Sequence, residues 1–534
     1  MNLPHKLKNA FILCVIILTG LALRLYNVGF PSIGYHNMQE NEYMAIAHNM
    51  EKTHDYIRKS PYTYDAFGDN PSAGIDAQPP LVSYQTLIAW KLFGENVWAP
   101  RIFNILFGLA GILVLYFISN LLFSSRNLSL FASLILAIIP LAVFFSRNLQ
   151  PESPALFFML LGNLFYLRFI SGGNRYNLIA GGLSFSAAWL YKFSFLIGVL
   201  PFLFCFPLRA RGGKEKSFAS YIMPLLLPYL VILFSVFLLY RSGQFSFADF
   251  NAEKLSAIFS SSYWKERSNA IWWHMKGENF TLIFILLSLL GIVVAFLKRK
   301  GLAERYIMGW TSAIVPYCVF LSNPVSQNNY YQMPFLALVC VSTTYAVSFI
   351  SGQIKRIVKR DPMIPIVMVI IILSVPSVRD SIMRMYSTVF VGVDVAGESL
   401  RSFTKPDERI FLLTHAQGYG IARYAQRYVG WTYELEGFKN KEKKFGVRYV
   451  CIYPTEFIRS LKQDKPELFD YIQSNYHIKE AGLTEEPERL FYLILEKGKS
   501  SEAQNFLESI SGQKYLKTIY RIAGKYVFFY TVRP

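Results

Sequence analysis

Long apolar runs alternate with short polar segments over the first 378 residues, and this pattern predicts membrane-spanning helices. A hydrocarbon core of about 30 Å needs about 20 mainly apolar residues in one helix. The first run follows His5, Lys6 and Lys8 and resembles a signal peptide, but it has no small-x-small cleavage site, so we expect it to be retained. Eleven runs are predicted to span: 10–26, 98–121, 126–146, 151–170, 176–191, 193–208, 218–240, 280–298, 306–322, 330–351 and 362–378.

Two ambiguous segments decide which loops face the cytoplasm. Segment 80–94 is apolar except for Gln85 and Lys91, and we interpret it as a helix along the membrane surface. We interpret 176–208 as two short helices hinged at Lys192. This choice places three loops of four bases each inside, as the positive-inside tendency requires: 209–216, 298–305 and 355–360. It therefore predicts an N-terminus inside, and an outer location for loop 27–101, turn 146–152, the Lys192 hinge, loop 241–279 and turn 323–329.

The composition changes near residue 379. Strand-like runs at 409–414, 447–453 and 489–496 enclose helix-like stretches at 418–427 and 455–475, an alternation typical of a small α/β domain. We predict an α-helical polytopic membrane protein of about 11 transmembrane helices. Its transmembrane domain is 1–378, including the first extracytoplasmic loop 27–101 with juxtamembrane helices and a second large outer loop 241–279, and its soluble extracytoplasmic α/β domain is 379–534.

Composition supports a multi-pass membrane protein, which we expect in the plasma (cytoplasmic or inner) membrane. The 534 residues are 53% hydrophobic and only 17% charged, which soluble domains rarely combine. The net charge of +19 suggests nucleic acid, but many of the bases lie in short loops between spans, where orientation and anionic lipids explain them. The five cysteines form no CxxC or Cys/His spacing, so neither a disulfide framework nor a thiolate zinc site is predicted.

The first outer loop has the strongest chemical character. Residues 27–79 hold seven acids against three bases, and Glu40 and Glu42 fall in the polar run that begins at Gly34. A carboxylate facing water beside lipid can accept a proton from an acceptor group, which makes this loop a candidate reaction site. The alternative is an ordinary solvated loop.

Two outer turns share this polar character. Turn 146–152 carries Arg147 and Glu152, with Pro151 ending one helix and opening the next. Turn 327–334 is rich in amides and tyrosines, which suit a sugar, and its candidate binding residues are Gln327, Asn329, Tyr330 and Tyr331. The alternative for both turns is a helix cap with an interfacial aromatic belt.

Two cations lie beside or between apolar runs. Lys192 separates two runs of about 16 residues, and ionisable groups at such positions are costly and usually functional, so it is a candidate for holding a lipid phosphate. Arg101 opens the second span. The alternative for both is a side chain that extends to the interface. In loop 241–279, Trp264, Trp272 and Trp273 favour an interfacial helix that either borders a lipid substrate or simply anchors the chain.

Taken together, these motifs resemble the GT-C glycosyltransferases, in the family that includes the lipid A aminoarabinose transferase and the protein O-mannosyltransferases. The resemblance covers about residues 5–350. The matching motifs, after the acidic first loop and Pro79-Pro80, are Phe93-Gly94-Glu95-Asn96 to Arg101, Arg147 to Gln150-Pro151-Glu152, Lys192, and Tyr330-Tyr331 to Pro334.

The resemblance implies transfer of a sugar from a polyprenyl-phosphate donor to a lipid, glycan or protein acceptor on the extracytoplasmic face, with inversion. A first-loop carboxylate would be the general base, and basic residues would stabilise the departing phosphate. The family usually has Asp-Glu where this chain has Gln39-Glu40, so the base is Glu40, Glu42 or His36, or the role is absent. Gln78 replaces a Lys that often precedes Pro-Pro, which leaves Arg101, Arg147 and Lys192 for the phosphate, with Glu152 as a second carboxylate.

Two other functions stay open: a transporter or flippase for a lipid-linked sugar, and a non-catalytic membrane scaffold. Polar groups cluster at the outer ends of the spans rather than near their middles, which favours surface chemistry over transport. No nucleotide is implied. A divalent metal on Glu40, Glu42 and Glu152 has the right ligand chemistry, but the ligand spacing does not support it, so we predict no cofactor, no metal and no nucleic-acid partner.

Overall fold

The computed structural model describes residues 5–57, 59, 62, 79–205, 230, 234, 237, 260–299, 301–414, 416–485, 488–498, 506 and 512–534. The chain forms two compact units. The first comprises Met1–Val28, Asp76–Leu81 and Trp98–Arg384, and the second comprises Gly29–Ile75, Val82–Val97 and Met385–Pro534. Most of the first outer loop therefore belongs to the same unit as the C-terminal residues.

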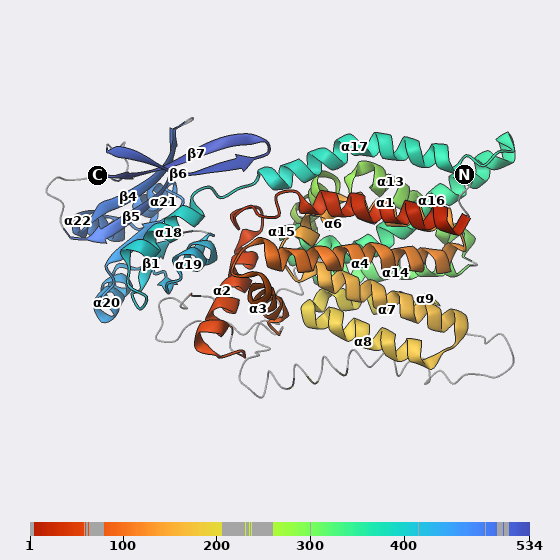
Figure 1. Cartoon of the computed structure of the whole chain (residues 1–534), viewed down its shortest axis with the longest axis horizontal. Coiled ribbons are helices and arrows are strands. Elements are labelled where there is room, and N and C mark those ends of the chain that lie inside the picture. Colours follow the sequence, from red (N-terminus) through yellow and green to blue (C-terminus); the bar gives the residue numbers. More distant parts are fainter. Residues whose placement is uncertain are drawn as a thin grey trace. The chain divides into compact units, whose positions relative to one another are not determined.

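The first unit is helical (Figure 1). Its helices are α1 (His5–Leu25), α4 (Trp98–Phe123), α5 (Arg126–Ile138), α6 (Pro140–Arg147), α7 (Glu152–Gly172), α8 (Arg175–Tyr191), α9 (Phe202–Cys205), α12 (Ser261–His274), α13 (Thr281–Lys298), α14 (Leu302–Phe320), α15 (Ser322–Gln327), α16 (Leu336–Val358) and α17 (Met363–Ser387). The described residues of this unit also form two 3-10 helices, Phe193–Val199 and Asn329–Phe335, and one π-helical turn, Met275–Asn279.

Six helical segments in the described part of the chain are long and apolar enough to cross a membrane, or up to seven if the bent pair α5 and α6 forms one span. The predicted class of polytopic membrane protein is thus confirmed, whereas the count of about 11 spans stays a prediction. Helix α3 (Leu81–Phe93) has 13 residues, or about 20 Å, which is too short for a 30 Å core and consistent with a helix that does not span.

The predicted span 126–146 is broken at one point. Ile139 has an extended backbone, because the ring of Pro140 disfavours the helical region for the residue before it, and α5 and α6 meet at 58°. The break frees carbonyl groups near the end of α5. Arg24, fully buried within the first apolar run, donates to the carbonyls of Leu136 at 3.2 Å and Ala137 at 2.9 Å. The guanidinium therefore donates hydrogen bonds to main-chain carbonyls, which lipid cannot do.

The second unit contains a seven-stranded mixed sheet with helices on both faces (Figure 1). The order is β2-β1-β3-β5-β4-β7-β6, in which β2, β1 and β3 are parallel and the other neighbours are antiparallel. A C-terminal α/β domain was predicted and is confirmed. The strands are β1 (Ile410–Leu413), β2 (Val429–Gly430), β3 (Tyr449–Ile452), β4 (Tyr476–Glu485), β5 (Glu488–Lys497), β6 (Gln513–Ile522) and β7 (Lys525–Arg533).

Helices of this unit are α2 (Asn37–Thr53), α3, α18 (Val393–Phe403), α19 (Gly418–Ala425), α20 (Leu435–Phe445), α21 (Phe457–Asp464) and α22 (Pro466–Asn475). The stretch 455–475, predicted as one helix-like run, is two helices. Pro466 cannot donate a main-chain hydrogen bond, so it opens α22 as its first residue instead of continuing α21.

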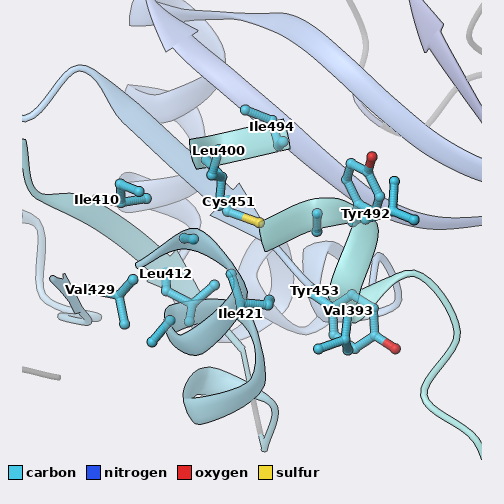
Figure 2. Packing of buried hydrophobic residues seen from close by; sticks show 14 of the residues in the cluster. Val393, Leu400, Ile410, Leu412, Ile421, Val429, Cys451, Tyr453, Tyr492 and Ile494 are labelled. Atoms are coloured by element: carbon cyan, nitrogen blue, oxygen red, sulfur yellow. The ribbon is translucent and has the colours of Figure 1, made fainter. Parts of the chain in front are cut away.

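Alternation along β1 divides the core of this unit into two layers. Ile410 and Leu412 join one cluster, which α18 and α19 cover (Figure 2), while Phe411 and Leu413 point into the cluster that α20, α21 and α22 cover. Ala45 of α2 belongs to the first cluster. The first outer loop is therefore packed into the core of this unit and is not simply a solvated loop.

Candidate functional site

A buried ion pair lies in the first unit, where the chain breaks between two apolar helices. Lys192 follows the last residue of α8 with an extended backbone (φ −157°, ψ 119°), at the hinge that the loop charges predicted. Its Nζ donates to Oε1 of Glu152, the first residue of α7. The exposed fractions are 5% for Lys192 and 0% for Glu152, so both charges are removed from water. Oε2 of Glu152 is also buried and accepts no hydrogen bond from the part of the chain that the structure describes.

Two aromatic rings complete the surroundings of Lys192. Its Nζ lies 4.1 Å from the ring centroid of Tyr330 and 4.4 Å from that of Tyr331, distances at which a ring face attracts a cation. Phe145 of α6 packs edge-on against Tyr330, with 5.7 Å between centroids. The predicted residues Glu152, Lys192, Tyr330 and Tyr331 are therefore brought together, from three segments far apart in the sequence.

The turn between α6 and α7 is held by a residue that sequence reasoning missed. Nδ2 of Asn104 donates to the carbonyls of Asn148 (2.6 Å) and Gln150 (2.8 Å). The turn is polar and buried, so these carbonyls need such a donor. Asn104 lies in the second turn of the apolar helix α4, and that isolated amide was the available signal. Its two bonds fix the direction in which Glu152 enters α7.

Arg101 and Arg147 both hold the chain that follows α1. Nη1 of Arg101 donates to the carbonyl of Val28, and Nη1 of Arg147 donates to the carbonyl of Asn27, each at 2.8 Å. Both side chains are buried. Two of the three cations predicted for the phosphate therefore bind consecutive main-chain carbonyls, which gives them a clear structural role.

A second buried carboxylate, Glu278, anchors the turn that carries the tyrosines. Its Oε2 accepts from Nδ2 of Asn329 at 2.9 Å and lies 2.9 Å from Nδ1 of His274, whose Nε2 is 3.1 Å from the carbonyl of Ser326. Asn329 thus fixes the turn from inside, whereas Gln327 is exposed and bonds to Asn323 on its own helix. The four-residue spacing of His274 and Glu278 was a signal for this network that the sequence reasoning did not use.

Glu40 lies in the first turn of α2, in the second unit. It is 4% exposed, and Oγ of Ser32 donates to its Oε2 at 2.6 Å. The positive end of the helix dipole favours a carboxylate in the first turn. Glu42 is only half-buried and, two residues away, projects from another side of the helix, so the two carboxylates cannot share one position. His36 precedes the helix in a left-handed conformation (φ 57°).

Residues near the C-terminus position this end of α2. Nδ2 of Asn37 donates to Oε1 of Gln417 at 2.9 Å, and the main-chain N–H of Ser32 donates to the hydroxyl of Tyr424 at 2.9 Å. A Cβ on Gly420 of α19 would lie 2.6 Å from Cγ1 of Val393 and 3.4 Å from Nδ2 of Asn41, so α2 and α19 approach closely. The segment with Glu40 is thus held by hydrogen bonds and packing from a region some 380 residues away.

The remaining predictions about the site are not tested by the structure. Gln78 lies outside the described residues. Within those residues, no group of three or more His, Cys, Asp or Glu side chains is arranged to hold a metal ion, and the absence of a metal stays a prediction.

Comparisons with known proteins find similarity to glycosyltransferases. Residues 77–240 match a family model described as dolichyl-phosphate-mannose-protein mannosyltransferase. A curated protein of Bacillus subtilis (strain 168), "Putative mannosyltransferase YycA", is 26% identical over 203 residues, which is 36% of this chain and 28% of that protein.

Two solved structures are similar over most of the chain. The oligosaccharyltransferase AglB of Archaeoglobus fulgidus, in complex with an inhibitory peptide and a dolichol-phosphate, matches with a TM-score of 0.57 at 14% identity, over 91% of this chain and 74% of that chain. ArnT from Cupriavidus metallidurans, bound to undecaprenyl phosphate, matches with a TM-score of 0.50 at 14% identity, over 90% of this chain and 97% of that chain. At such identities the likeness concerns the fold.

Proposed function

We propose that this chain, which has the GT-C glycosyltransferase fold expected from its sequence, transfers a sugar from a polyprenyl-phosphate donor to a hydroxyl-bearing acceptor. The two solved structures contain dolichol-phosphate and undecaprenyl phosphate, respectively, and the matching family model is described by a dolichyl-phosphate-linked mannose. These ligands support a lipid phosphate as the donor carrier. The acceptor is a lipid, a glycan or a protein.

The observation that carries this proposal is the environment of Lys192. A buried ammonium group between apolar helices is expensive, and such residues usually serve a function. Here it lies against Glu152 and two tyrosine rings. An ammonium group in a site with little water stabilises the charge that develops on a departing phosphate. We assign Lys192 to the donor phosphate, with Glu152 holding the ammonium in place and the tyrosine rings shaping its surroundings.

We assign Glu40 as the general base. Its carboxylate accepts the proton of the acceptor hydroxyl while that oxygen attacks the anomeric carbon. The bond from this carbon to the phosphate oxygen then breaks, and the lipid phosphate leaves. One displacement inverts the anomeric configuration. Gln39 cannot accept a proton, so Glu40 takes the role, and the hydrogen bond from Ser32 fixes its orientation.

The proposal includes a membrane orientation. The N-terminus faces the cytoplasm, and the unit that holds Glu40 and the seven-stranded sheet faces the opposite side, as the loop charges predict. A transporter or a scaffold is the less favoured function, since a buried carboxylate held in a first helical turn is of no evident use to either.

The test separates donor binding from chemistry. Undecaprenyl phosphate, as the probe, is titrated into the purified protein in nanodiscs, and transfer is followed with the sugar-lipid that accumulates in a deletion strain. Lys192→Met should lose binding of the probe, and Glu40→Gln should bind normally but lose transfer. Glu51→Gln on the exposed part of α2 and Lys91→Met on α3 are matched controls that should behave as the wild type. Full transfer by Glu40→Gln would refute its role, and unchanged probe binding by Lys192→Met would refute the phosphate site.

A further inference from the structure

The hairpin of β6 and β7 exposes an apolar face that the folded unit leaves uncovered. Its large apolar side chains are about half or more exposed: Leu516 51%, Ile519 48%, Tyr526 65% and Phe528 47%. Contiguous exposed apolar residues of this kind commonly mark a surface that binds a protein or a membrane.

The strand register places these residues on one face. Ile519 pairs with Phe528, and Arg521 pairs with Tyr526, so each pair lies on the same side of the hairpin. A shift in register between Leu516 and Thr518 adds a residue to β6. Because of this bulge, Leu516 lies on the same face as Ile519, although the two are three residues apart. The bulge therefore joins four side chains into one apolar face.

The same hairpin is strongly basic. Residues 513–533 contain five Lys or Arg and no Asp or Glu. Lys514 and Arg533 pair with acids of β4. Lys517, Arg521 and Lys525 are exposed and form no salt bridge within the described part of the chain. Apolar and aromatic side chains edged by unpaired cations match the interface of a bilayer that contains anionic lipids.

The hairpin is also attached close to a membrane span. Tyr520 donates a hydrogen bond to Asp394, and a Cβ on Gly392 would lie 2.5 Å from the ring of Phe529, so the buried face of the hairpin packs on the start of α18. Only four residues lie between Gly392 and Ser387, the last residue of the apolar helix α17, and the five steps of chain reach at most about 18 Å.

The hairpin is long enough to reach from this attachment back to the membrane surface. Beyond the apolar part of α17, the charged turns from Arg379 to Ser387 rise by about 12 Å. A strand of ten residues is about 33 Å long. β7 pairs with β4 only over Phe529–Val532, and in the described part of the chain residues 525–528 are flanked by β6 alone. The free half of the hairpin thus projects from the sheet and carries three of the four exposed apolar residues.

We infer that the β6–β7 hairpin binds the surface of the bilayer, with Leu516, Ile519, Tyr526 and Phe528 in the interface and Lys517, Arg521 and Lys525 against anionic phospholipid head groups. The role is independent of the transfer reaction proposed above. It would fix the sheet-containing unit relative to the membrane by a contact additional to α17.

The experiment uses the full-length protein, one copy per nanodisc, in lipids with and without phosphatidylglycerol. Cys14 and Cys318, the cysteines that are not buried, are replaced by Ala. Ile519→Cys then carries an environment-sensitive nitrobenzoxadiazole dye. Glu436→Cys is the matched control. Its side chain is 81% exposed, and its helix, α20, packs on β1 through Phe438 and Phe411, far from β6 and β7 in the strand order.

The expected result is a blue-shifted emission at position 519, with quenching by lipids that carry a nitroxide near the head group, and neither effect at position 436. Replacing Arg521 and Lys525 by Gln should weaken the association in phosphatidylglycerol by about fivefold for each cation, which corresponds to about 1 kcal/mol per charge. An unshifted emission at 519 would overturn the inference. A blue shift without lipid quenching would also overturn it, because another part of the protein would then cover the hairpin.

Discussion

Removing the ammonium of Lys192 should destabilise the protein strongly, because it leaves a charge behind. Glu152 is fully buried, and its Oε1 accepts from Lys192. Breaking a buried ion pair by deleting one partner typically costs about 3–5 kcal/mol, mostly as the cost of the remaining charge. Methionine keeps the length and apolar character of the stem. Loss of attraction to the rings of Tyr330 and Tyr331 adds about 0.5–2 kcal/mol.

The double variant Glu152→Gln with Lys192→Met should restore most of this stability. It removes both charges, and replacement of a buried ion pair by neutral groups is often close to neutral for stability. We therefore expect a coupling free energy of about 2–3 kcal/mol between the two positions, in the upper part of the range for residues in contact. Binding of undecaprenyl phosphate should stay lost, since the cation is still absent.

Thermal unfolding of the wild type, the single variants Lys192→Met and Glu152→Gln, and the double variant in one detergent, together with undecaprenyl phosphate binding, measures both effects. A double variant that regains both stability and binding would assign Lys192 a purely structural role and refute our placement of the phosphate. A Lys192→Met protein as stable as the wild type would contradict the buried pair itself.

Three further perturbations test other parts of the structure. Arg24→Met should lower the free energy of unfolding by about 1–3 kcal/mol for each carbonyl left unpaired at the end of α5, which a lower melting temperature would reveal. An unchanged melting temperature would show that other groups donate to these carbonyls. Gly420→Leu should separate α19 from α2. Hydrogen-exchange mass spectrometry should then show less protection of the main-chain amides around Glu40, and unchanged protection would contradict the close contact. Burial raises the pKa of Asp394 from 3.8 to about 6, so the folded state holds this proton more tightly than the unfolded state does. The resulting stabilisation is complete below about pH 4 and is lost as the pH rises through 6, about 3 kcal/mol in all, and Asp394→Asn should remove this dependence from melting curves recorded between pH 4 and 7.

The features that the sequence predicted well have local signals. The charges of the loops that follow indicated the break at 192, and Pro151 indicated the helix start at Glu152. The first follows from the positive-inside tendency and the second from the restrictions that a proline imposes on its neighbours. The alternation near residue 379 likewise predicted an α/β domain, and β1, β3 and β5 occur in the predicted runs.

The features that it missed depend on distant contacts. β6 and β7 carry charged and exposed apolar residues in place of a regular alternation, so their pairing could not be recognised before the sheet was known. Glu40 was expected in a polar loop, but its burial requires Ser32, Tyr424 and the packing of α19. No pattern within residues 27–101 indicates that a segment 380 residues later supplies these contacts.

Comparison of the buried cations shows why Lys192 is the strongest candidate for the donor phosphate. Irregular backbone at membrane depth needs donors for its carbonyls. Arg24, Arg101 and Arg147 each supply such a donor, so the fold accounts for their burial. Lys192 instead pairs with a carboxylate and two aromatic rings. A hydrophobic pair of similar volume could hold the same helices at lower cost. The presence of a buried cation and carboxylate at this break therefore supports our proposal that the ammonium binds a charged ligand.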